Sequence, residues 1–171
     1  MIKEFVINER RFVNVSTVNA DIDVEVPISV AYNQWTQFES FPQFLSGIDE
    51  IQQLDDRRLH WKVSVAGVKR EFDAEITEQV PDERVAWKST GGEDHAGVVT
   101  FHRLSADTTR ISVNLDWKPQ GVVESVGALL QIDDIQIKKD LRTFKEKIES
   151  NGFETGAWRG SIDRAPDATG R

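Results

Sequence analysis

The stretch that decides the fold is residues 58–75, RLHWKVSVAGVKREFDAE, which alternates apolar and polar residues on both sides of an Ala-Gly dipeptide. This alternation predicts two half-buried strands joined by a tight turn as an antiparallel hairpin. With the turn at that dipeptide, Trp61 falls opposite Phe72. His60 then falls opposite Asp73. Apolar residues therefore pair on one face and opposite charges on the other, which favours a single register.

The same alternation recurs along most of the chain, separated by turn residues such as Asp-Asp, Pro-Asp and Gly-Gly pairs. A second hairpin places Phe101 opposite Ile111. Glu78 is expected to face inward with Ile76, unless a bulge near Pro81 changes the register. We therefore expect strands at residues 18–26, 48–54, 58–66, 68–80, 84–89, 96–104 and 108–117.

Helical patterns flank this run of strands. Two short helices are expected at residues 29–38 and 41–45, with Ser29 and Ser40 as their N-terminal caps. A long helix is expected at residues 122–150, because apolar residues recur there at helical spacing. The residues of this apolar stripe are Val122, Val126, Leu130, Ile137, Leu141, Phe144 and Ile148.

The composition indicates one globular domain: 171 residues, 39% hydrophobic and 29% charged. We divide the chain into an N-terminal extension (1–16), the domain (17–152) and a C-terminal tail (153–171). The 21 basic and 29 acidic residues give a net charge of −8, which disfavours nucleic acid as a partner. Cysteine is absent and no apolar stretch could span a bilayer, so we expect neither disulfides nor a membrane span. Because the first residues lack the apolar run of a signal peptide, a cytoplasmic location is expected.

Four segments resemble one protein family: AYNQWTQFESFPQF (31–44), EFDAEITEQVPDERVAWKS (71–89), GVVTFHRL (97–104) and ETGAWRG (154–160). They are similar to the bacterial polyketide cyclase/dehydrase or coenzyme Q-binding-like proteins of the START/Bet v 1-like (SRPBCC) superfamily. The resemblance covers roughly residues 17–160. It implies an α+β helix-grip fold, in which a curved antiparallel sheet of about seven strands surrounds the long C-terminal helix. It also implies a cavity for an apolar or aromatic small molecule, but it does not imply catalysis.

Two cationic residues are candidates for chemistry on the inner face of the sheet. Arg70 falls opposite Val63, where it needs a counter-charge, water or a ligand unless its guanidinium extends to solvent from the strand end. His95 faces inward near Trp117 if its strand reaches that far, and is otherwise a loop histidine beside a Gly-Gly turn. His95 and His102 lie an odd number of residues apart, so they point to opposite faces and a shared metal site is not expected.

Asp133 is an ionisable residue at a position where the sequence pattern predicts an apolar one, because it lies at the centre of the apolar stripe of the long helix. A carboxylate there would face the sheet. Desolvation would raise its pKa unless a cation such as Arg70 or His95 formed an ion pair with it. The alternative is a helix kink or a solvent-filled mouth that leaves Asp133 in water.

The inward aromatic residues serve either as cavity walls or as ordinary core. The expected ligand-binding residues are Trp35, Trp61, Arg70, Phe72, Trp87, Phe101, Trp117, Leu130, Asp133 and Ile137. Trp158 is expected to fold back after the long helix as a plug or an interface anchor.

Two functions follow from these observations. The first is binding of a small apolar or aromatic ligand, such as a lipid, quinone or polyketide-like molecule, without a cofactor or metal. The second is a polyketide cyclase or dehydratase that folds its substrate and uses His95, Asp133 and Arg70 for acid/base and enolate-stabilising roles.

Overall fold

The structure is a computed structural model. It describes residues 2–7, 11–65, 68–91, 94–118, 126–151 and 154–162. Its side chains are described for residues 17–64, 69–91, 95–116, 135–151 and 154–162.

The described part of the chain forms one antiparallel sheet of eight strands in the order β1-β2-β8-β7-β6-β5-β4-β3. From β3 to β8 each strand pairs with the one before it and the one after it in the chain, and β8 also pairs with β2. The strands are β1 (Ile2–Ile7), β2 (Arg11–Val24), β3 (Ile48–Gln53), β4 (Arg58–Val65), β5 (Val68–Val80), β6 (Arg84–Gly91), β7 (Asp94–Ser105) and β8 (Thr108–Lys118).

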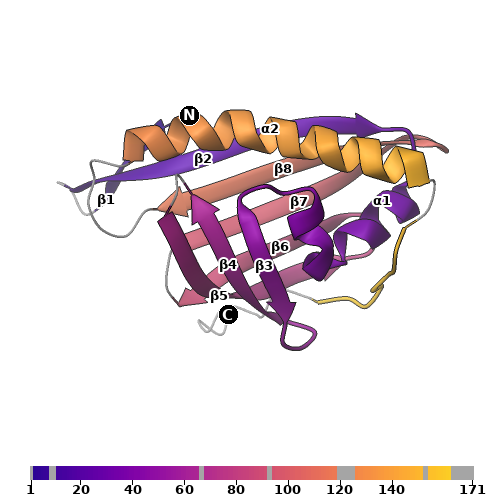
Figure 1. Cartoon of the computed structure of the whole chain (residues 1–171), viewed down its shortest axis with the longest axis horizontal. Helices are drawn as coiled ribbons and strands as arrows, with labels where there is room; N and C mark the ends of the chain where they lie inside the picture. Colours follow the sequence, from indigo (N-terminus) through magenta and orange to yellow (C-terminus); the bar gives the residue numbers. More distant parts are fainter. Residues whose placement is uncertain are drawn as a thin grey trace, which may run out of the picture.

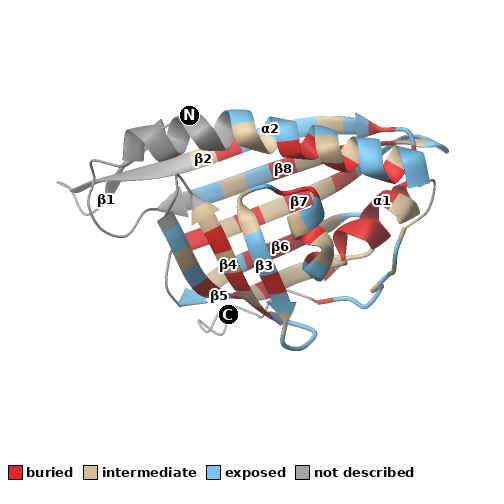
Figure 2. Cartoon of the chain, in the orientation of Figure 1, coloured by how far each residue is buried: buried red, intermediate tan, exposed pale blue. Residues whose placement is uncertain are grey.

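The described residues also form three helices: α1 (Ile28–Trp35), the 3₁₀-helix η1 (Phe38–Gln43) and α2 (Val126–Asn151). Figure 1 shows α2 running lengthwise over the sheet beside β2 and β8, with α1 and η1 at one end. The buried residues gather on the sheet, on α1 and on the side of α2 turned toward the sheet (Figure 2). This arrangement confirms the predicted helix-grip fold. None of the helices in the described ranges is long and apolar enough to cross a bilayer.

The sheet continues into the N-terminal segment. The first strand of the predicted domain begins at Arg11 rather than at residue 18, and β1 pairs with it. Residues 2–7 and 11–16 therefore add pairing beyond the seven strands expected from alternation.

The short helices differ from the prediction at their starts. The N-cap of α1 is Pro27 and no side chain caps the helix, so the prediction of Ser29 as its cap is wrong. The second helix is a 3₁₀-helix that begins at Phe38, and Ser40 lies within it, donating its hydroxyl hydrogen bond to the carbonyl of Gln37. A 3₁₀-helix brings every third residue onto the same side. This conformation therefore suits a segment whose phenylalanines at positions 38, 41 and 44 are all buried.

The predicted registers are confirmed. Trp61 lies opposite Phe72 and His60 lies opposite Asp73 in the β4–β5 hairpin, and the β7–β8 hairpin pairs residue 101 with residue 111. A bulge between Ile76 and Glu78 changes the alternation in β5, so Gln79 is buried and Glu78 instead pairs with Arg84. The bulge alternative is therefore the correct one for Glu78.

His60 lies on the outer face of this hairpin. Its Nδ1 is 2.7 Å from Asp73 Oδ1 and its Nε2 is 3.2 Å from Glu71 Oε2, contacts that raise its pKa, chiefly through Asp73. Lys62 lies opposite Glu71 in the same register and forms an ion pair with Glu50 of β3 at 3.2 Å.

Replacing His60 by Ala should therefore change the free energy of unfolding at pH 7 by no more than about 0.5 kcal/mol, since exposed ion pairs contribute little. Urea unfolding of both proteins measures this change. A loss of more than about 2 kcal/mol would contradict the placement of His60 on the solvent face.

Candidate functional site

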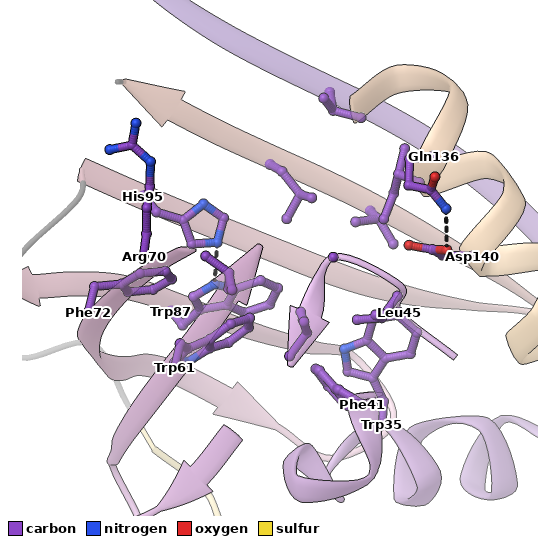
Figure 3. A pocket seen from close by; sticks show the side chains of 17 residues that line it. Trp35, Phe41, Leu45, Trp61, Arg70, Phe72, Trp87, His95, Gln136 and Asp140 are labelled. Atoms are coloured by element: carbon purple, nitrogen blue, oxygen red, sulfur yellow. Dashed lines mark hydrogen bonds between the residues drawn. The ribbon is translucent and has the colours of Figure 1, made fainter. Parts of the chain in front are cut away.

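A cavity of about 160 Å³ lies between the inner face of the sheet, η1 and α2 (Figure 3). Its wall is mostly aliphatic and aromatic, and the polar groups on it are few. The lining residues are Val18, Trp35, Phe41, Leu45, Gly47, Ile48, Trp61, Val63, Arg70, Phe72, Trp87, His95, Val113, Leu115, Gln136, Ile137 and Asp140.

One side of the cavity is a stack of three aromatic rings from neighbouring strands. Trp61 stacks with Phe72, with ring centroids 5.6 Å apart, and with Trp87, with centroids 6.0 Å apart. Residues 61 and 72 form a cross-strand pair between β4 and β5, and residue 87 belongs to β6, the strand on the other side of β5. The three rings therefore come from three strands that are neighbours in the sheet. Trp87 covers Gly97, its partner on β7, so closely that a Cβ at position 97 would come within 2.3 Å of the ring.

His95 belongs to β7 and is only 9% exposed, so it is not the loop histidine of the alternative prediction. Its ring packs against Trp61, Phe72 and Trp87, with centroids 5.6 to 6.1 Å away. The indole N–H of Trp87 donates a hydrogen bond of 3.1 Å to His95 Nε2. Because Nε2 accepts that bond, the neutral imidazole carries its proton on Nδ1.

Burial lowers the pKa of His95 from 6.5 to about 4, while the backbone of Asp116 acts in the opposite direction. The imidazole is therefore neutral at pH 7. A neutral imidazole cannot form the ion pair with a carboxylate of the long helix for which His95 was one candidate.

Arg70 lies opposite Val63, as predicted, and lines the cavity while remaining half-buried. In Figure 3 its side chain extends past His95, away from the stacked tryptophans. The guanidinium therefore stands at the edge of the cavity rather than at its apolar centre.

Asp140 is the buried carboxyl group that sequence reading missed. It is 6% exposed on the cavity wall. Ser46 donates to it from its backbone N–H (3.2 Å) and its hydroxyl (3.0 Å), and Gln136 Nε2 donates at 2.8 Å. Burial raises the pKa of Asp140, and the hydrogen bonds from Gln136 and Ser46 oppose this shift. The available signal was spacing, because Asp140 lies about two helical turns after Asp133 and so on the same face.

The other predicted ligand-binding residues fall into three groups: those that line the cavity, one that does not, and those whose side chains are not described. Trp35, Trp61, Phe72, Trp87 and Ile137 all lie on the cavity wall. Phe101 does not: it lies further along β7 and packs edge-on against Tyr32 of α1, with centroids 5.4 Å apart, which corrects its assignment. The side chains of Trp117, Leu130 and Asp133 lie outside the described residues, so their roles stay predictions.

The segment after α2 packs on the outer side of α1 rather than into the cavity. The backbone N–H of Trp158 donates to Thr36 Oγ1 at 3.0 Å. Arg159 donates to Asn33 Oδ1 at 2.6 Å and forms an ion pair with Asp82 at 2.8 Å. These contacts tie residues 154–162 to α1 and to the β5–β6 turn.

The histidines do not gather into a metal site. His102 is exposed opposite Arg110, on the other face from His95. Among the described side chains, no group of three His, Asp or Glu residues could hold a metal ion.

A curved antiparallel sheet that encloses an apolar cavity beneath a C-terminal helix defines the helix-grip class of ligand-binding folds. Residues 24–146 match the family described as polyketide cyclase / dehydrase and lipid transport. The chain belongs to this family.

Three similar proteins place the chain among bacterial relatives. An uncharacterized 17.2 kDa protein from the melC2-rnhH intergenic region of Streptomyces lincolnensis is 55% identical over 149 residues, covering 86% of this chain and 99% of the relative. The structure of a START superfamily protein from Mycobacterium smegmatis has a TM-score of 0.65 at 17% identity, covering 77% of this chain and 98% of that one. The Zhui aromatase/cyclase from Streptomyces sp. R1128 has a TM-score of 0.62 at 10% identity, covering 81% and 93%. The two structures show a shared fold.

Proposed function

We propose that the protein binds a small apolar or aromatic molecule, of the lipid, quinone or polyketide-like kind, in the cavity between the sheet and α2. The observation that carries this proposal is the cavity itself, with about 160 Å³ of space bordered by stacked aromatic rings and aliphatic side chains. An apolar cavity of roughly 150 Å³ is large enough to hold benzene. Binding there would remove the apolar surface of a ligand from water.

Native mass spectrometry of the purified protein tests this proposal most directly, followed by thermal shifts with lipids, quinones and polyphenols. We expect a retained small molecule or a raised melting temperature with one of these classes. A protein that retains nothing and responds to none of them would contradict the proposal.

A cavity-filling variant provides a site-specific prediction. Leu115 lines the cavity and is half-buried, so Leu115→Trp should fill the space and weaken binding of the neutral fluorophore N-phenyl-1-naphthylamine by about tenfold or more, roughly the loss of 1.4 kcal/mol. Fluorescence titration measures this affinity. Leu104→Trp is the matched control, because Leu104 is 46% exposed and does not line the cavity. Equal binding by both variants would place the fluorophore elsewhere.

The second candidate function is a polyketide cyclase or dehydratase, supported by the family and by the fold shared with an aromatase/cyclase. In that reaction the cavity would fold a poly-β-keto chain, with Arg70 stabilising an enolate oxygen and His95 or Asp133 moving a proton. The state of His95 favours binding over this chemistry. Its Nε2 is occupied by Trp87, and a pKa of about 4 makes it a weak base at neutral pH. Turnover of a poly-β-keto thioester that is lost in Arg70→Ala would reverse this preference.

A further inference from the structure

The cavity wall carries a buried acidic side chain, Asp140, for which the described side chains provide no cation. Asp140 is 6% exposed and is the acidic residue among those that line the cavity. Its partners in the described part of the chain are Ser46 and Gln136, which are both neutral. A buried carboxylate is costly unless a positive charge compensates it, so the place of Asp140 beside a cavity needs an explanation.

One oxygen of this carboxylate keeps a position for a further donor. Oδ1 accepts the hydroxyl of Ser46 at 3.0 Å and the amide of Gln136 at 2.8 Å, so both of its lone pairs are in use. Oδ2 accepts only the backbone N–H of Ser46, at 3.2 Å. In Figure 3 the carboxylate extends from α2 toward the middle of the cavity. Oδ2 is therefore the atom that can accept a hydrogen bond from a molecule in the cavity.

The surroundings of Asp140 favour a positively charged partner. Trp35 lines the cavity and packs against Phe144, one turn after Asp140 on α2, with centroids 5.1 Å apart; aromatic rings attract cations. The cationic Arg70 lies at the other end of the cavity, beyond the neutral imidazole of His95 (Figure 3). The hydrogen bonds donated to Asp140 favour its charged form, and the net charge of −8 attracts cations to the protein.

We infer that the cavity binds an organic cation, an ammonium compound whose N–H donates to Oδ2 of Asp140 while its apolar part lies against the aromatic wall. This inference rests on the proposed function, because it uses the same cavity, and it goes beyond that function by giving the ligand a positive charge. An ammonium group donates a hydrogen bond and neutralises the carboxylate in one contact. Burial raises the pKa of Asp140, and a cation beside it would oppose that shift. A neutral ligand would leave the charge without a partner.

The test compares three probes with one bicyclic ring system: 2-aminoindane, which is a cation at pH 7, the neutral alcohol 2-indanol and the hydrocarbon indane. Their affinities are measured at pH 7 by NMR titration of ¹⁵N-labelled wild type and Asp140→Asn, a variant that keeps the size of the side chain and removes its charge. We expect the wild type to bind 2-aminoindane about fivefold more tightly than 2-indanol. Asp140→Asn should weaken 2-aminoindane binding about tenfold and change indane binding less than about twofold, which also shows that the variant is folded.

Glu146→Gln is the matched control, because Glu146 is an exposed residue of α2 that does not line the cavity, and the change removes the same charge. It should bind all three probes as the wild type does. If Asp140→Asn weakens 2-aminoindane binding no more than Glu146→Gln does, the inference is overturned while the proposed function stands. Binding of 2-indanol at least as tight as that of 2-aminoindane would overturn it in the same way, since a neutral donor would then suffice. If none of the three probes binds the wild type, the proposed cavity function and this inference both fall.

Discussion

Lowering the pH from 7 to 4 is expected to remove about 3 kcal/mol from the free energy of unfolding through His95 alone. The folded pKa of this imidazole is about 4, against 6.5 for the ordinary value. Between pH 6.5 and 4 the imidazole is protonated in the unfolded chain but not in the folded one. The free energy of unfolding therefore falls as the pH is lowered through this range. Each unit of pKa difference corresponds to about 1.4 kcal/mol, so the full loss is about 3.5 kcal/mol, of which about 3 kcal/mol is reached at pH 4, where the folded imidazole is half protonated.

Urea unfolding of wild type and His95→Gln at several pH values measures this effect. The variant keeps an acceptor within reach of Trp87 but has no group that titrates, so its stability should depend less steeply on pH between 4 and 6.5. His60→Ala is a control of opposite sign, because the raised pKa of His60 makes its contribution largest below 6.5 and lost as the pH rises. The NMR titration of the His95 ring gives the pKa independently of any variant. Parallel pH profiles of wild type and His95→Gln, or a titration near 6.5, would contradict the prediction.

Replacing Gly97 by Ala is expected to destabilise the protein by about 2–3 kcal/mol, because the added Cβ collides with the Trp87 ring and the ring must shift out of its packed position. The Cβ would lie 2.3 Å from Cζ2 and 2.6 Å from Cε2 of Trp87. Such a shift would disturb the stacking of Trp87 with Trp61 and its hydrogen bond to His95. Relief of the collision would therefore disturb the cavity wall, and binding of N-phenyl-1-naphthylamine should weaken as well.

Gly91→Ala is the matched control, since no atom lies within 4 Å of the Cβ it would add. We expect that variant to be neutral or slightly stabilising, because alanine loses less backbone entropy than glycine on folding. The double variant Gly97→Ala with Trp87→Phe should be less destabilised than the sum of its single changes, since the smaller ring leaves room for the methyl group. Equal stability of the Gly97 and Gly91 variants in urea unfolding would show that Trp87 does not cover Gly97.

The strands and their registers could be predicted because they depend on residues that lie near one another in the sequence. In the β4–β5 hairpin the apolar partners and the charged partners each identify the same pairing, and a shift by one residue would reverse both faces. The sheet pairing of residues 2–7 and 11–16 could not be predicted in this way. Their composition is mixed, and their partners are each other and the far end of β8.

The cavity wall was predictable only in part. Alternation along the strands placed Trp61, Phe72 and Trp87 on the inner face, and these residues do border the cavity. Phe101 obeys the same alternation but lies under α1, because alternation specifies a face of the sheet and not a position along it. Asp140 was missed because the hydrogen bonds that hold it come partly from Ser46, a residue distant in the sequence.

The strands from residue 18 onward and the residues that share a face could be read from the sequence alone, since periodicity and the charges paired across a hairpin are properties of residues near one another in the chain. The protonation and hydrogen-bonding state of the buried polar groups depends instead on the tertiary structure. His95 becomes a neutral acceptor, and Asp140 a carboxyl group with a raised pKa, through burial by residues from several strands and helices. Desolvation depends on everything that excludes water around a group, and no local pattern in a chain contains that information.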